Sequence, residues 1–351
     1  MEKRTAYHVS LNNLVLTLFF LTIFTFDKAR AADAPDIAIA KQFFGNAKPA
    51  TQCKTLSRHP SGDIKSISPE ANKFVQSYLE LWRKEDAKGI YELLYPSAQK
   101  SFSVYKIKAL FQHMKQSYKG PLEYTALRVW GIYTKDGNPE PIDCEDENLK
   151  IFPVYGSPLQ LLAWMQIRGE RELGRLSTMF IYSGGTFKIA TLTLQQWTFG
   201  GKDPESLMAD GDKDAKEKNY VSAFVKYDLA KKLIDESGNI AYPDTVILKD
   251  KLNELKKTHD WEPLIKSKLK NYDLPRIASY YATNKGPALL VYYRLKKQTE
   301  QDVREQTCKN MGKTLSDSNL LKGLAGLRCN FLYPQHSADQ EGPLKGIFYA
   351  F

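Results

Sequence analysis

The order of the hydrophobic patterns, helical first and strand-like afterwards, constrains the fold of this 351-residue chain more than any other feature. Ser68 and Pro69 suit the N-cap and the first position of a helix, and apolar residues follow at helical spacing. Two further helices are expected over 87–94, ended by Pro96, and over 103–118. Because the strand-type segments come only after these helices, the pattern indicates an α+β fold.

Five segments rich in aromatic and β-branched residues are expected to form an antiparallel meander. They are Glu123–Thr134, Leu149–Tyr155, Leu161–Arg168, Arg175–Tyr182 and Thr186–Gln195. Gly184 and Gly185 separate the last two segments, and two glycines suit a two-residue hairpin because both can take positive φ. The expected register sets Tyr182 opposite Phe187, Phe180 opposite Ile189 and Thr178 opposite Thr191, with all of these on one face of the sheet.

A helical connector is expected after the meander. Six residues fit the spacing of one tetratricopeptide-type helical hairpin: Leu207, Gly211, Tyr220, Ala223, Tyr227 and Ala230. Three leucines indicate a further helix: Leu248, Leu252 and Leu255. Repeat arrays need about three copies to bury a continuous core, and the sequence shows one, so a connector is favoured over a peptide-binding solenoid.

The last segment has mixed character and is expected to form a ββαββ unit. The strands are expected at 276–283, 288–295, 327–333 and 345–351, with a polar helix over 299–315. The predicted organisation is a signal peptide (1–31), a poorly structured leader (32–67), a helix-and-sheet domain (68–200), a helical connector (201–270) and a small α+β domain (271–351).

Residues 1–31 have the parts of a secretory signal peptide. Lys3 and Arg4 form a basic start, Leu14–Phe26 is an uncharged apolar run, and Ala29-Arg30-Ala31 provides small residues for cleavage. Thirteen apolar residues reach about 20 Å as a helix, whereas a bilayer core is about 30 Å thick. The sequence therefore predicts export to the periplasm, and an uncleaved inner-membrane anchor is the alternative.

Composition sets further limits on function. The chain has 50 Lys+Arg and 40 Asp+Glu, a formal charge of +10, and 42% apolar residues, which is ordinary for a globular protein. The charges are interspersed, and no basic run alternates with aromatic residues, so nucleic acid is not an expected partner.

Four cysteines remain after the predicted cleavage: Cys53, Cys144, Cys308 and Cys329. An even number of cysteines in an exported chain favours disulfides. Of the three possible connectivities we favour Cys53–Cys144 and Cys308–Cys329, because each pair then lies within one proposed domain or its leader. A metal site or a reactive thiol is the alternative, although no CxxC or Cys/His cluster supports it.

Three short patterns add a family resemblance. They are Tyr78-Leu79-Glu80-Leu81-Trp82, Tyr91-Glu92-Leu93-Leu94-Tyr95-Pro96 and Phe187-Lys188-Ile189-Ala190. Together with the order of elements, they make residues 68–200 resemble the nuclear transport factor 2-like, or cystatin-like, superfamily. The resemblance implies that helices and a curved antiparallel sheet form a cone with a pocket at its mouth. Members include enzymes, ligand binders and assembly subunits, so the fold does not select the function. The segment 271–351 resembles no family known to us.

The search for reactive groups finds no catalytic signature. The histidines of the mature chain, His59, His113, His259 and His336, are far apart in sequence and none has HExxH spacing. Gly312-Lys313-Thr314 resembles the end of a phosphate-binding loop, but Thr307 stands where that loop needs glycine.

Acid–base chemistry in the cone would need a carboxylate on an apolar wall. The carboxylates near the predicted sheet are Glu123, Asp143, Glu145 and Asp146, and all are interpreted as exposed. No catalytic residue, metal ligand or cofactor is therefore predicted.

Aromatic residues of the predicted sheet remain as candidate ligand contacts. They are Trp130, Trp164, Tyr182 and Phe187, and an apolar or aromatic ligand would suit them if they line a cavity; core packing is the alternative. The sequence predicts an exported, non-enzymatic protein that binds or assembles with an unknown protein partner. A small apolar-ligand binder or cone-pocket isomerase or hydrolase is one alternative, and a membrane-anchored secretion-system subunit is another.

Overall fold

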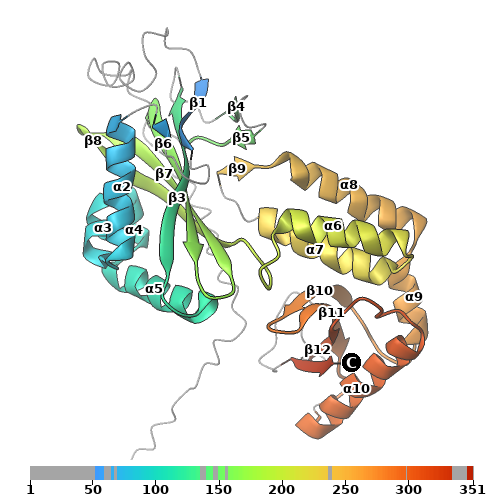
Figure 1. Cartoon of the computed structure of the whole chain (residues 1–351). Helices are drawn as coiled ribbons and strands as arrows, with labels where there is room; N and C mark the ends of the chain where they lie inside the picture. Colours follow the sequence, from blue (N-terminus) through green and yellow to red (C-terminus); the bar gives the residue numbers. More distant parts are fainter. Residues whose placement is uncertain are drawn as a thin grey trace, which may run out of the picture.

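The computed structural model describes residues 52–58, 65–66, 69–134, 140–144, 149–154, 157–235, 239–297, 299–333 and 346–350. Figure 1 shows three parts in chain order: helices packed on a large sheet, a helical region, and a small C-terminal sheet with one long helix. The predicted signal peptide lies outside the described residues.

Four N-terminal helices cover one face of the large sheet (Figure 1). They are α2 (Pro69–Arg83), α3 (Ala87–Leu93), α4 (Pro96–Ser101) and α5 (Val104–Tyr118). The apolar stripe of α2 is buried, and Trp82 at its C-terminal end is 0% exposed. Side-chain caps begin α3 and α5, where Asp86 and Ser103 accept backbone N–H groups. Pro96 starts α4 instead of only ending the previous helix, because proline suits the first helical position.

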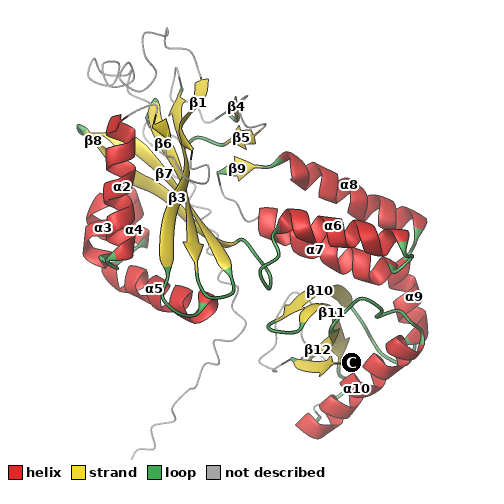
Figure 2. Cartoon of the chain, in the orientation of Figure 1, coloured by secondary structure: helices red, strands yellow, loops and turns green. Residues whose placement is uncertain are grey.

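The large sheet has six antiparallel strands in the order β2-β1-β3-β6-β7-β8. They are β1 (Gln52–Arg58), β2 (Lys65–Ser66), β3 (Glu123–Tyr133), β6 (Leu159–Arg168), β7 (Leu173–Ser183) and β8 (Thr186–Gln196). The α+β class and the packing of N-terminal helices on an antiparallel sheet are thus confirmed. Figure 2 shows the helices of this part as one layer and the strands as another.

Two expectations about the sheet differ from the structure. The segment 52–58, which the sequence assigns to the leader, forms β1 and pairs with β3. Its mainly polar residues do not alternate with apolar ones, so the sequence pattern gives no sign of a strand there. The segment from Leu149 onward is not part of the meander. It forms β5 (Leu149–Ile151) of a separate sheet with β4 (Ile142–Cys144) and β9 (Ile240–Ala241).

The β7–β8 hairpin has the expected Gly184-Gly185 turn, with φ of 61° and 83°. Tyr182 pairs with Phe187 and Phe180 pairs with Ile189, as expected. Thr178, however, pairs with Leu192 and not with Thr191. Between Phe180 and Met179 the register shifts by one residue, so Ala190 is a β-bulge and every later residue of β8 changes face.

The helical region contains four helices: α6 (Pro204–Lys216), α7 (Tyr220–Asp235), α8 (Pro243–Thr258) and α9 (Trp261–Lys268). The α6–α7 hairpin is close-packed at Gly211, where a Cβ atom would lie 2.6 Å from the ring of Tyr227. Leu248 and Leu255 of α8 are buried, in agreement with the expected helix.

The C-terminal unit has the expected ββαββ order: β10 (Arg276–Ala282), β11 (Gly286–Arg294), α10 (Gln301–Asp317), β12 (Gly326–Leu332) and β13 (Ile347–Ala350). The sheet order is β10-β11-β12-β13, and β11 and β12 are parallel, so α10 is the crossover between them. α7 packs against this sheet, and Lys232 of α7 donates to Ser279 of β10.

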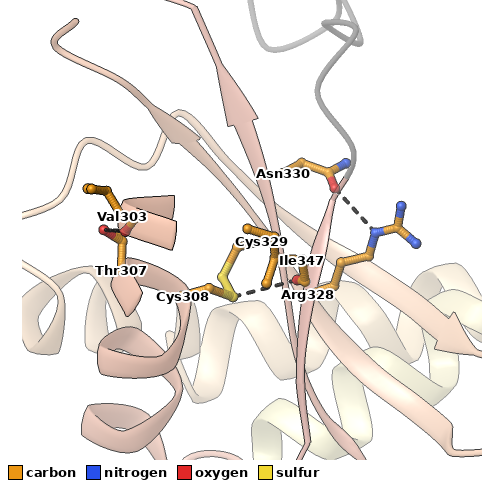
Figure 3. The surroundings of a disulfide bond; sticks show 7 residues. All are labelled: Val303, Thr307, Cys308, Arg328, Cys329, Asn330 and Ile347. Carbon is orange, nitrogen blue, oxygen red and sulfur yellow. Dashed lines mark hydrogen bonds between the residues drawn. A yellow bond between two sulfur atoms is a disulfide. The ribbon is translucent and has the colours of Figure 1, made fainter. Parts of the chain in front are cut away.

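Both favoured disulfides are present. Cys53 of β1 is bonded to Cys144 of β4, and Cys308 of α10 is bonded to Cys329 of β12. Figure 3 shows the second bond beside Ile347 of β13, with both cysteines fully buried. Two disulfides fit an oxidising compartment.

Candidate functional site

A cavity of about 410 Å³ lies between the face of the large sheet that α2–α5 leave uncovered and the helical region. Its walls come from the sheet, from β5, and from the N-terminal ends of α6 and α8, which both face the sheet in Figure 1. The lining includes Arg128, Trp164, Arg175, Trp197, Tyr242 and Asp244. This volume falls within the range of small-molecule pockets, about 300–1,000 Å³.

Two β-bulges place the sheet residues of this cavity. In a regular strand, residues an even number of positions apart share one face. In β3, however, Tyr124 packs on the helix side and Arg128, four residues later, lies on the cavity side. The extra residue Leu127 causes this reversal, because the register shifts between Ala126 and Arg128. The bulge at Ala190 acts in the same way in β8 and turns Gln195, the Cα partner of Arg175, toward the cavity side.

Arg175 is the central residue of the site. It lies on β7, between β6 and β8, and is 7% exposed. Its Cζ atom is 3.6 Å from the ring centroid of Trp164 and 3.1 Å from that of Trp197, and the two centroids are 6.3 Å apart, so the indoles lie on opposite sides of the guanidinium carbon. Tyr242, the N-cap residue of α8, accepts a hydrogen bond of 2.5 Å from Nη1 and stacks on Trp164.

The remaining donors of Arg175 point into the cavity. No carboxylate lies within ion-pair distance of this guanidinium among the described residues, and its one hydrogen bond there is to Tyr242. The other side-chain nitrogens of Arg175 are not fully buried, so they are accessible from the cavity. With an indole on each side of its carbon, the guanidinium can meet a ligand through the N–H groups along its edge, and that edge favours a bidentate carboxylate or phosphate.

Burial changes the acid–base properties of this pair without discharging the arginine. Desolvation lowers the pKa of Arg175 to about 10, and the contact with Tyr242 opposes the shift. Burial also raises the pKa of Tyr242, and Arg175 opposes that rise. At neutral pH the site therefore holds a charged guanidinium beside a neutral phenol.

The charges of the lining are separated between two walls. Arg128 and Arg175 come from the sheet, while Asp203, Glu205 and Asp244 come from the first turns of α6 and α8. Glu205 and Asp244 are exposed, so the acids lie at the mouth of the cavity and Arg175 lies in its depth.

The structure divides the four predicted ligand contacts between the two faces of the sheet. Trp164 lines the cavity, and Trp130 packs behind it with ring centroids 5.3 Å apart. Tyr182 and Phe187 lie on the other face, in the core beneath α2. Trp164 is thus the one predicted residue that lines this cavity.

The space between the helices and the sheet, where the family resemblance implies a pocket, is filled by the core. The cavity recorded there has about 10 Å³ and is lined by apolar residues such as Trp82, Phe102 and Leu192. A volume of this size holds at most about one water molecule. Of the candidate carboxylates, Glu123 and Asp143 are exposed as expected, and Glu145 and Asp146 lie outside the described residues.

Sequence reasoning missed Arg175, Trp197 and Tyr242. One signal was available for Arg175, because it is a charged residue inside an otherwise apolar strand, and such a residue needs a partner or a function. Trp197 and Tyr242 follow a strand and precede a helix, respectively, and nothing in their local sequence indicates that they meet.

Comparisons with protein-family models, with curated proteins and with solved structures found no match to this chain. Within the residues that the structure describes, no helix combines the length and the apolar character needed to span a bilayer, and no group of three or more His, Cys, Asp or Glu side chains is arranged to hold a metal.

Proposed function

We propose that this chain is an exported, non-enzymatic binding protein of the Gram-negative periplasm, whose ligand occupies the cavity between the large sheet and helices α6 and α8. The observation that carries the proposal is Arg175, a buried cation whose free donors face a cavity of about 410 Å³. A buried charge without an ionic partner is unfavourable, and such charges are retained mainly where a ligand completes them.

The chemistry of the site defines the ligand in outline. An anionic group, carboxylate or phosphate, binds in the plane of the Arg175 guanidinium. An apolar or aromatic body packs against the walls formed by Trp164, Trp197 and Ile234. A ligand that fills this cavity thus needs an apolar body and one anionic group that neutralises the buried cation.

The export part of the proposal rests on two features. The sequence of residues 1–31 has the pattern of a cleavable signal peptide. The bonds Cys53–Cys144 and Cys308–Cys329 require an oxidising compartment to persist. The arrangement of α2–α5 on the sheet supports a relationship with the nuclear transport factor 2-like superfamily, with the ligand site on the opposite face from the pocket of that family.

Binding is tested by calorimetry on the protein that starts at Ala32, with 3-phenylpropionate as the probe. We expect saturable binding to the unmodified protein and at least about tenfold weaker binding to Arg175→Met, because a charge-assisted hydrogen bond contributes about 1.5–3 kcal/mol. Arg168→Met is the matched control, since Arg168 is an exposed arginine of the same sheet that does not line the cavity. Equal binding of the probe by the two variants refutes the proposed site.

Export is tested by mass spectrometry of the full-length chain expressed in a Gram-negative host. The expected product begins at Ala32 and is recovered from the periplasm. A product that begins at Met1 and sediments with membranes contradicts export by cleavage and favours an anchor at Leu14–Phe26.

A further inference from the structure

We propose that the ligand is a small zwitterion with an apolar body, of the class of a free aromatic amino acid or a short peptide, bound with its carboxylate on Arg175 and its ammonium group at the acidic mouth of the cavity. This inference rests on the proposed function and adds the second charge of the ligand. It is carried by the separation of charges between the two walls of the cavity.

The depth of the cavity selects a carboxylate or another planar anion. The Arg175 guanidinium is planar, so the donors that do not bond Tyr242 lie in one plane along its edge, with Trp164 and Trp197 on opposite sides of its carbon. A carboxylate is planar and accepts two parallel N–H groups from such an edge. Arg128, on the same wall, adds a second positive charge near this position.

The mouth of the cavity selects a cation. Asp203, Glu205 and Asp244 lie on the wall opposite the arginines, at the first turns of α6 and α8. The carboxylate of Asp203 accepts the Ser206 backbone N–H and caps α6, while Glu205 and Asp244 are exposed.

The balance of the lining charges excludes a simple anion as the best ligand. The lining holds three carboxylates against two arginines, so a ligand with only negative charge is repelled at the mouth that it must pass. A ligand that carries one charge of each sign pairs with both walls. The aromatic rings of the lining, Trp164 and Trp197 on the sheet side and Tyr242 at the start of α8, then contact the apolar body.

The test compares three probes that share one apolar body and differ only in charge: phenylalanine, 3-phenylpropionate and 2-phenylethylamine. Calorimetry on the protein that starts at Ala32 is expected to rank phenylalanine first, about fivefold or more above 3-phenylpropionate, with the amine weakest. The dipeptide of phenylalanine is a fourth probe and distinguishes a free amino acid from a short peptide, because its charges are further apart.

Substitutions of the acidic residues at the cavity mouth test whether those residues bind the ammonium group of the ligand. The double variant Glu205→Gln with Asp244→Asn is expected to bring phenylalanine within about twofold of 3-phenylpropionate, since each exposed charge pair contributes about 0.2–1 kcal/mol. Glu262→Gln is the matched control, because Glu262 is also an acid in the first turn of a helix, α9, but does not line the cavity.

Each outcome has a distinct meaning. If 3-phenylpropionate binds as tightly as phenylalanine and the mouth variants change neither, the zwitterion is refuted while the anion site stands. If the amine binds most tightly, or if none of the four probes binds at millimolar concentration, both the zwitterion and the proposed function are refuted.

Discussion

Replacing Arg175 with methionine separates a binding role of the guanidinium from a role in holding the fold together. Burial lowers the pKa of the Arg175 guanidinium to about 10, which means that keeping the charge in the folded protein costs about 3 kcal/mol. Because the folded pKa is the lower one, this cost applies at every pH below about 10. The indole rings of Trp164 and Trp197, stacked on the guanidinium, return about 1–2 kcal/mol each.

These opposing contributions nearly cancel. Methionine keeps much of the apolar stem and fills the space between the indoles, so we expect Arg175→Met to change the free energy of unfolding by about 1 kcal/mol or less. The same substitution is expected to weaken anion binding at least about tenfold. A residue that matters for the ligand and not for stability is the mark of a functional site.

The measurement is urea unfolding followed by tryptophan fluorescence, with Trp164 and Trp197 as reporters beside the substitution. Arg168→Met, on the same sheet, is the control for loss of an exposed arginine. A loss of about 3 kcal/mol or more on Arg175→Met would show that the guanidinium organises the three aromatic rings as part of the core. Such a loss would refute the claim that Arg175 is retained to bind a ligand.

Three further predictions concern stability. Gly211→Ala lowers the free energy of unfolding by about 1–2 kcal/mol, although alanine is the better helix former, because the added methyl overlaps the ring of Tyr227. In a Tyr227→Leu background the same substitution is expected to stabilise the protein, and stabilisation by Gly211→Ala alone contradicts the close packing. Replacing both Cys308 and Cys329 with alanine lowers the free energy of unfolding in urea by about 3 kcal/mol, because the bond restricts a 21-residue loop of the unfolded chain. An unchanged unfolding midpoint excludes the bond. Burial raises the pKa of Asp212, but hydrogen bonds from Lys251 of α8 and from Tyr227 outweigh burial and leave that pKa below its ordinary value. The stabilising contribution of the ionised carboxylate is therefore lost as the pH falls below about 4, and Asp212→Asn should lose less stability between pH 7 and pH 3 than the unmodified protein in urea unfolding.

The elements that the sequence predicts correctly are those that local chemistry determines. α2 and α5 have one apolar stripe each and clear helix starts, so both begin within one residue of the expected position, and α5 also ends where expected. The Gly184-Gly185 turn fixes the first pairs of the β7–β8 hairpin for the same reason. Cysteine pairing was predictable because each pair lies within one compact unit.

The site was less predictable because it depends on two single-residue bulges and on a contact between distant segments. Neither Leu127 nor Ala190 differs from its neighbours in a way that marks an extra residue, yet each reverses the face of everything after it. The expected pairing of Thr178 with Thr191 was wrong for this reason. Tyr242 reaches Arg175 only because the helical region folds back onto the sheet, and no periodicity in the sequence reports that step.

The two disulfides join cysteines that are consecutive in the chain, Cys53 with Cys144 and Cys308 with Cys329. When a chain crosses a membrane from its N-terminus, its thiols reach the oxidant in the order of their numbers. Each early thiol then meets its native partner before a competing cysteine has emerged, and pairing on arrival gives the native connectivity. For the export proposed above, this order would let the chain reach its native disulfides with a thiol oxidase alone, without a disulfide isomerase.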